Sequence, residues 1–210
     1  SGERARHFRA IANAAFLQET PQYIPSRRLA AALEFDRAAR ERGVRSCFVG
    51  TGQAGMMISG SGVCLDAVRV DYASGAVEAE VMRHAPGQDV LWVEGQGSLL
   101  NPASTATLPL IRGSQPTHLV VVAKAGVKTL RSFPHIEIPP LSKVVALYEQ
   151  VAAAAGAFAP VPVVGIALNT WEQNDAEARA SVEAAARETG LPCTDAVRFG
   201  PGEILDRILR

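Results

Sequence analysis

Short apolar runs alternate along the chain with longer, Ala-rich amphipathic segments, and this alternation restricts the fold more than any other feature. Several of the runs are apolar at every position, as expected of strands that have helices on both faces. The predicted strands are 46–50, 66–70, 90–94, 118–123, 161–168 and 193–197. The predicted helices are 27–43, 74–85, 139–156, 175–190 and 202–209. Strands alternating with helices of this length predict an α/β fold with a mostly parallel sheet flanked by helices.

Residues at the ends of these segments support the assignment. Gly190 follows a predicted helix at the position of a left-handed C-cap, and Asn174 precedes the same helix as a plausible N-cap. Pro139 and Pro140 open another helix at its first turn. The stretch IANAAFL (11–17), in contrast, is more typical of a helix than of a strand.

Composition narrows the class of function. The chain has 210 residues, zero formal net charge and 6% aromatic residues, which favours a single domain and argues against nucleic acid or an anionic membrane as partner. A small-molecule substrate is expected instead. Three cysteines without CxxC spacing fit a reduced, cytoplasmic setting. No apolar run approaches the roughly 20 residues that span a bilayer.

The loops that follow the strands are where chemistry is expected, because open α/β sheets bind ligands at the carboxyl ends of their strands. The loop GTGQAGMMISGSG (50–62) has five glycines, which allow backbone N–H groups to approach an anion closely. Gly52, Gln53 and Gly55 are therefore candidates for cofactor binding. The loop matches neither GxxxxGK[ST] nor GxGxxG, and an irregular loop without a ligand is the alternative.

Two acidic residues at predicted strand ends are the catalytic candidates. Glu94 ends the buried run VLWVE, and Asp71 follows the run DAVRV. Either carboxylate could act as a general base, and Glu94 could instead hold Mg²⁺. The alternatives are a satisfied buried glutamate and a helix-capping aspartate. A metal is not favoured, because the sequence shows no cluster of metal-ligand residues.

These stretches together resemble one family. The segments TGQAGMMISGSGVCLDAVRVDYASGAVE, VEGQGSLLNPASTATLPLIRGSQPTHLVVV and VVGIALNT are similar to the C-terminal domain of the DUF1611 family. Characterised members of that family include D-glutamate N-acetyltransferase. The VEGQGS motif also resembles the VEGAG motif of dethiobiotin synthetase and the cobyrinic acid synthases. The resemblance implies a three-layer, P-loop-NTPase-like (Rossmann-like) domain over 27–210, with acetyl-CoA or a nucleotide phosphate as its anionic ligand.

The chain departs from the family at the phosphate-binding loop. In register, this loop falls on PQYIPSRRLAA (21–31), which contains no glycine and places Arg28 at the lysine position. Pro21 and Pro25 each remove an N–H donor. Residues 1–26 are therefore interpreted as a divergent segment that replaces the phosphate-loop region. Family proteins also carry an additional N-terminal α/β domain, so the resemblance implies either a trimmed chain or a divergent single-domain member.

The leading hypothesis is an N-acetyltransferase that moves an acetyl group from acetyl-CoA to the amine of an acidic amino acid such as D-glutamate. The alternatives are a non-catalytic or partner-dependent subunit, and an ATP/Mg-dependent ligase or kinase. A homo-oligomer or a complex with another biosynthetic protein is expected. The residues assigned to cofactor binding are Gly52, Gln53, Gly55, Gly95, Gln96, Gly97 and Arg28. Those assigned to substrate binding are Ser74, Ser98, Arg112, Gln115, Lys124 and Asn169.

Overall fold

The computed structural model describes residues 9–14 and 27–210, with side chains from Leu29 onward. Its sheet has six strands in the order β2-β3-β1-β4-β5-β6, and every neighbouring pair is parallel. The strands are β1 (Arg9–Ala14), β2 (Ser46–Val49), β3 (Val90–Val93), β4 (His118–Lys124), β5 (Val163–Asn169) and β6 (Cys193–Thr194). The helices are α1 (Arg27–Glu41), α2 (Gln53–Ser59), α3 (Val70–His84), α4 (Thr107–Ser114), α5 (Leu141–Ala152), α6 (Asp175–Thr189) and α7 (Gly202–Leu209).

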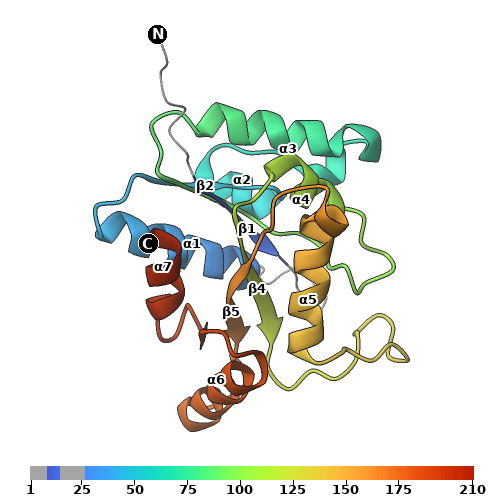
Figure 1. The fold of residues 1–210 in the computed structure, drawn as a ribbon, viewed down its shortest axis with the longest axis vertical. Coiled ribbons are helices and arrows are strands. Elements are labelled where there is room, and N and C mark those ends of the chain that lie inside the picture. The colour runs from blue at the N-terminus through green and yellow to red at the C-terminus, as the bar shows by residue number, and fades with distance from the viewer. Residues whose placement is uncertain (1–8, 15–26) are drawn as a thin grey trace.

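Helices cover both faces of the sheet, which makes three layers (Figure 1). Side chains of β3 alternate between the faces, because successive strand residues point in opposite directions. Val90 and Trp92 pack with α1 and α7 on one face, whereas Leu91 and Val93 pack with α3 and α4 on the other. Helix α5 covers the second face further along, over β4 and β5. The α/β three-layer prediction is confirmed.

The prediction of a helix over 11–17 is wrong for 11–14, the part of that stretch that the structure describes. Residues 9–14 form β1, the strand that lies between β3 and β4, with Ala12 paired to Val93 on one side and to Leu119 on the other. Alanine has the highest helix propensity, but propensity differences amount to less than about 1 kcal/mol per residue, and pairing with a strand on each side overrides them. The α/β fold therefore already includes part of the 1–26 segment. Of the expected phosphate-loop position 21–31, residues 21–26 lie outside the described residues, and 27–31 form the first turn and a half of α1.

The prediction of a strand over 66–70 is also wrong. Leu65–Ala67 form a 3-10 turn, and α3 begins at Val70. The buried residues of α3 are Ala73, Val77 and Val81, four positions apart, which is the spacing of one helix face. Asp71 consequently lies in the first turn of a helix and does not end a strand. Two short helices, α2 and α4, were not predicted.

The predicted ends of α6 are confirmed. Asn174 accepts a hydrogen bond from the backbone N–H of Glu177, whose side chain in turn accepts one from the Asn174 backbone, and Gly190 closes the helix in the left-handed conformation. Pro140 is the N-cap of α5. None of the described helices is long and apolar enough to cross a lipid bilayer.

Candidate functional site

Glu94 lies directly after β3 at the carboxyl edge of the sheet, with only 4% of its surface exposed. Its Oε2 accepts hydrogen bonds from the backbone N–H groups of Thr51 (2.9 Å) and Gly52 (3.2 Å). The Thr51 hydroxyl donates to the Glu94 carbonyl at 2.9 Å. These N–H groups precede α2, where the helix dipole also favours negative charge. The Glu94 carboxylate thus fastens the glycine-rich loop after β2 to the end of β3.

The glycines of that loop make room for side chains of the protein itself. A Cβ atom at Gly55 would lie 2.1 Å from Glu94 Oε2, and one at Gly52 would lie 2.4 Å from Gln96 Nε2. Gln53, at the first position of α2, is exposed. The N–H groups of Thr51 and Gly52 are directed at Glu94, so an external anion would have to use other donors. The cofactor-binding roles of Gly52, Gln53 and Gly55 stay predictions.

The loop after Glu94 is held by hydroxyl groups. Gly97 has φ of +67°, and a Cβ atom there would lie 1.8 Å from the Ser104 hydroxyl oxygen. That oxygen accepts a hydrogen bond from the Ser98 N–H at 3.0 Å, and the Thr107 hydroxyl donates to the Gln96 carbonyl at 2.9 Å. The Ser98 hydroxyl in turn accepts a hydrogen bond from the Leu100 N–H at 3.1 Å, so Gly97 and the buried Ser98 each have a structural reason for their identity. Gly95 is buried beside Glu94.

Lys124 and Asn169 share the carboxyl edge with Glu94. They end β4 and β5 and are register partners. Lys124 Nζ lies 2.7 Å from a carboxylate oxygen of Glu172, and the Asn169 side-chain oxygen accepts a hydrogen bond from the Trp171 N–H at 3.1 Å. Strand β1 separates β3 from β4, and its Ala12 pairs with both Val93 and Leu119, so Glu94 lies level with Val120 of β4. Lys124 is therefore about 10 Å from Glu94 across the strands and about 13 Å further along them.

Arg112 and Gln115 do not lie at this edge. Helix α4 leads into the first residue of β4, which places its last turn at the amino end of the sheet. There the Arg112 guanidinium lies 5.0 Å from the centre of the Phe158 ring, and the Gln115 side chain donates to the Arg112 carbonyl. The structure therefore separates these two substrate-binding candidates from Glu94 and Lys124.

The remaining candidates are more peripheral. Ser74 lies where α3 packs on α4, and its carbonyl oxygen would be 2.2 Å from a Cβ atom at Gly113. Asp71 is exposed in the first turn of α3. Arg28 belongs to the first turn of α1, but its side chain is outside the described part of the chain.

An open groove of about 910 Å³ lies beside Lys124. The ends of β4 and β5 contribute Ala123, Lys124 and Leu168, while segment 125–141 and helix α6 contribute the rest of the lining. Segment 125–140 projects beyond the sheet (Figure 1) and is braced by hydrogen bonds between its two arms, including Ile138 N–H to the Lys128 carbonyl at 2.8 Å. The sequence predictions missed this groove, because no local motif marks two segments that only the fold brings together.

Asp195 is a buried carboxylate that the sequence analysis also missed. One of its oxygens accepts hydrogen bonds from the Thr170 N–H (2.9 Å) and hydroxyl (2.6 Å). The other accepts from the N–H groups of Val197 and Arg198, both at 3.1 Å. The sequence did not mark Asp195, because the predicted strand 193–197 includes this residue, whereas β6 ends at Thr194. Asp195 joins the ends of β5 and β6 as Glu94 joins those of β2 and β3.

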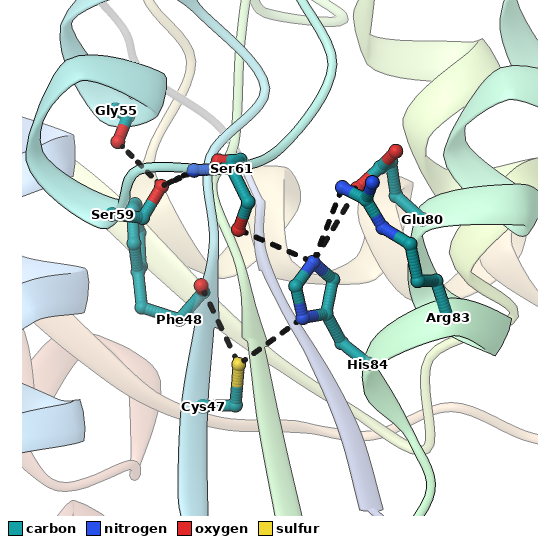
Figure 2. Close-up of polar contacts among 8 residues, drawn as sticks. All are labelled: Cys47, Phe48, Gly55, Ser59, Ser61, Glu80, Arg83 and His84. Atoms are coloured by element: carbon teal, nitrogen blue, oxygen red, sulfur yellow. Dashed lines mark hydrogen bonds and ion pairs between the residues drawn. The ribbon is translucent and has the colours of Figure 1, made fainter.

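A polar network on the outer side of β2 holds the glycine-rich loop against α3 (Figure 2). His84 Nε2 lies 3.3 Å from the Ser61 hydroxyl and 3.4 Å from a Glu80 carboxylate oxygen, and His84 Nδ1 lies 3.8 Å from Cys47 Sγ. Burial, reinforced by the charge of Asp36, raises the pKa of the Cys47 thiol. The thiol therefore stays protonated near neutral pH, which fits a structural contact better than a nucleophile.

Within residues 9–14 and 27–210, no three His, Cys, Asp or Glu side chains gather in an arrangement that could hold a metal ion. Among the described residues, the carboxyl edge of the sheet carries two buried carboxylates, Glu94 and Asp195, together with a lysine and an amide next to a groove.

Comparisons with known proteins agree with this architecture. Residues 28–205 match the family described as "Domain of unknown function (DUF1611_C) P-loop domain". The chain is 34% identical over 176 residues to a D-glutamate N-acetyltransferase of Pseudoalteromonas sp., covering 82% of this chain and 52% of the relative. It thus spans about half the length of that curated relative.

Two solved structures show the same fold. A DUF1611 family protein from Anabaena variabilis superposes with a TM-score of 0.91 at 50% identity, covering 96% of this chain and 57% of the other. Cobyrinic acid a,c-diamide synthase from Mycobacterium smegmatis, with bound ATP analogue and magnesium, superposes with a TM-score of 0.55 at 13% identity, covering 97% and 95%. The second likeness shows a shared P-loop-type fold alone. The matched residues and the sheet order together show that the chain belongs to the DUF1611 family.

Proposed function

We propose that the chain carries out acetyl-CoA-dependent N-acetylation of an acidic amino acid such as D-glutamate. The observation that carries this proposal is its likeness, over about four-fifths of the chain, to a relative named D-glutamate N-acetyltransferase. The geometry supports it with a carboxylate and a lysine on the same edge of the sheet, beside a groove large enough for a donor and an acceptor.

The reaction needs a base. The amine nitrogen attacks the thioester carbonyl carbon, so that an N–C bond forms, the C–S bond breaks and CoA leaves as a thiol. Because only the neutral amine is a nucleophile, a nearby group must take a proton from the ammonium form. Glu94 is the proposed acceptor, since the fold holds its carboxylate at the carboxyl end of β3. Asp71 is the alternative base, and its exposed position makes it the weaker candidate.

An acidic acceptor needs cations or amides for its carboxylates. Lys124 is 18% exposed and pairs with Glu172, which is 69% exposed. An ion pair with so exposed a partner is worth about 0–1 kcal/mol, so a substrate carboxylate can displace Glu172 from Lys124. The Asn169 amide, next to Lys124 in register, can bind a second substrate oxygen. These contacts select an amino acid with an acidic side chain.

The test is a transfer assay with the purified chain, acetyl-CoA and single amino acids, with thiol release and N-acetyl product both measured. D-glutamate is expected to give product, and D-glutamine, its neutral isostere, much less. Glu94→Gln should lower kcat by about 100-fold or more with folding retained, whereas Asp71→Asn should lower it by less than about threefold. If D-glutamate yields no N-acetyl product, the proposal is wrong.

A further inference from the structure

The groove beside Lys124 is larger than an acidic amino acid requires. Its volume of about 910 Å³ is near the upper end of the roughly 300–1,000 Å³ typical of small-molecule sites. An amino acid at Lys124 would fill a small part of this volume. A ligand longer than an amino acid, extending from the ends of β4 and β5, would fill the rest.

The lining of the groove is mostly aliphatic. Its floor is formed by Ala123 and Leu168 at the strand ends, one wall by Ile138 and Leu141, and the other by Ala184 of α6. Hydroxyl groups are placed within this apolar surface, at Thr129 on one side and at Ser181 on the other. Such a surface suits a chain of methylene and methyl groups interrupted by amides, since each buried amide needs a hydrogen-bonding partner.

The two lysines that line the groove differ in their exposure to solvent. Lys124 is largely covered, whereas Lys128, four residues further on, is exposed. The acidic residues of the lining are Glu137 and Glu188, and the Glu188 carboxylate accepts a hydrogen bond from the Ser142 N–H at 3.3 Å. Lys128 is the exposed cation of the lining and is the group that a polyanion would meet on the solvent side, with Glu137 beside it across the Thr129–Glu137 bridge. An acyl group at the other end of the same molecule would lie near Lys124.

We propose that this groove binds the acyl donor, with the pantetheine arm of acetyl-CoA along its aliphatic walls, the phosphates at Lys128 and the thioester toward Lys124. The inference rests on the proposed function for the identity of the donor and assigns that donor a place. In this arrangement the two substrates bind at different places: the amino acid is held at the ends of β3 to β5, and the donor enters from the side of α6.

Two variants test the two halves of this placement. Ala184→Trp fills the groove from α6, and its matched control is Ala176→Trp, an exposed alanine on the same helix that does not line the groove. Lys128→Ala removes the cation proposed for the phosphates. The probes are CoA, titrated calorimetrically, and two donors for turnover, acetyl-CoA and S-acetyl-pantetheine, the second of which lacks the nucleotide.

Ala184→Trp is expected to weaken CoA binding at least tenfold and to raise KM for both donors, while Ala176→Trp changes neither. Lys128→Ala should weaken CoA about fivefold and leave turnover of S-acetyl-pantetheine unchanged. Circular dichroism and Tm of each variant exclude misfolding. Unchanged CoA affinity in both Ala184→Trp and Lys128→Ala, or no CoA binding by the wild-type chain, would overturn the placement.

The outcomes separate this inference from the proposed function. If D-glutamate is acetylated but neither groove variant changes the affinity for CoA or the KM for acetyl-CoA, the donor binds elsewhere and the proposed function stands. If CoA binds in the groove but no amino acid is acetylated, the placement stands and the function is wrong.

Discussion

Replacing Gly55 with alanine tests the structural role of Glu94. Gly55 lies in the first turn of α2, and an added Cβ atom would lie 2.1 Å from Glu94 Oε2. That distance is far inside van der Waals contact, so the carboxylate must move. Moving it breaks the hydrogen bonds from Thr51 and Gly52, each worth about 1.5–3 kcal/mol because the acceptor is charged.

The expected loss in the free energy of unfolding follows from these terms. Loss of both bonds would cost about 3–6 kcal/mol, and the better helix propensity of alanine returns at most about 1 kcal/mol. Gly55→Ala should therefore destabilise the chain by about 2–6 kcal/mol. Urea unfolding followed by far-UV circular dichroism measures this as a lower midpoint at constant slope.

Two controls separate the clash from a general effect of alanine. Gly75 lies within α3 with nothing within 4 Å of an added Cβ atom, so Gly75→Ala should stabilise the chain by about 0.5–1 kcal/mol. In a Glu94→Ala background the clashing oxygen is absent and the tight contact that remains is with Gly50 Cα at 3.1 Å, so Gly55→Ala should then cost less than in the wild-type chain. Equal costs of Gly55→Ala in the two backgrounds would refute the contact between Gly55 and Glu94.

Three further predictions concern the rest of the described chain. The Asp195 carboxylate accepts four hydrogen bonds, and Asp195→Asn would turn an NH₂ group toward two of their donors. The substitution should lower the free energy of unfolding by about 2–4 kcal/mol in urea titrations, and a loss below about 0.5 kcal/mol would contradict that network. Asn174→Ala removes the capping box of α6 and should cost about 1 kcal/mol, whereas the neighbouring exposed Ala176→Ser should cost less than half of that. Burial, with the charge of Asp195, raises the pKa of Cys193 to about 12, while the unfolded thiol ionises near 9. At a pH between these two values, unfolding releases a proton, so the free energy of unfolding falls as pH rises from 9 to 12. Cys193→Ala should make this fall smaller, and an identical pH dependence of stability in the variant would contradict the raised pKa of Cys193.

The sheet and most of its helices could be predicted from the sequence, because apolar runs and capping residues are local signals. The central strand β1 could not, since its Ala-rich sequence forms a strand only by pairing with β3 and β4. The strand prediction for 66–70 is wrong because the chain from Val70 onward belongs to α3, whose buried face of Ala73, Val77 and Val81 packs against the sheet only as a helix.

The candidate site was predictable in part. The place of Glu94 at a strand end follows from the pattern, but its partners Thr51 and Gly52 lie more than 40 residues earlier and depend on the pairing of β2 with β3. Arg112 and Gln115 were chosen for their charge and amide, and only the direction of α4 shows that they face the other end of the sheet. The groove required α6 and segment 125–141 to be brought together, which no single stretch of sequence encodes.

A crystal structure of the chain with acetyl-CoA tests the central claim most directly, namely that acyl transfer takes place at the carboxyl edge beside Glu94 and Lys124. We predict density for the pantetheine arm in the groove, with the acetyl group near the ends of β3 and β4. Density for acetyl-CoA at the amino end of the sheet near Arg112, or a donor bound with its thioester far from both Glu94 and Lys124, would contradict it.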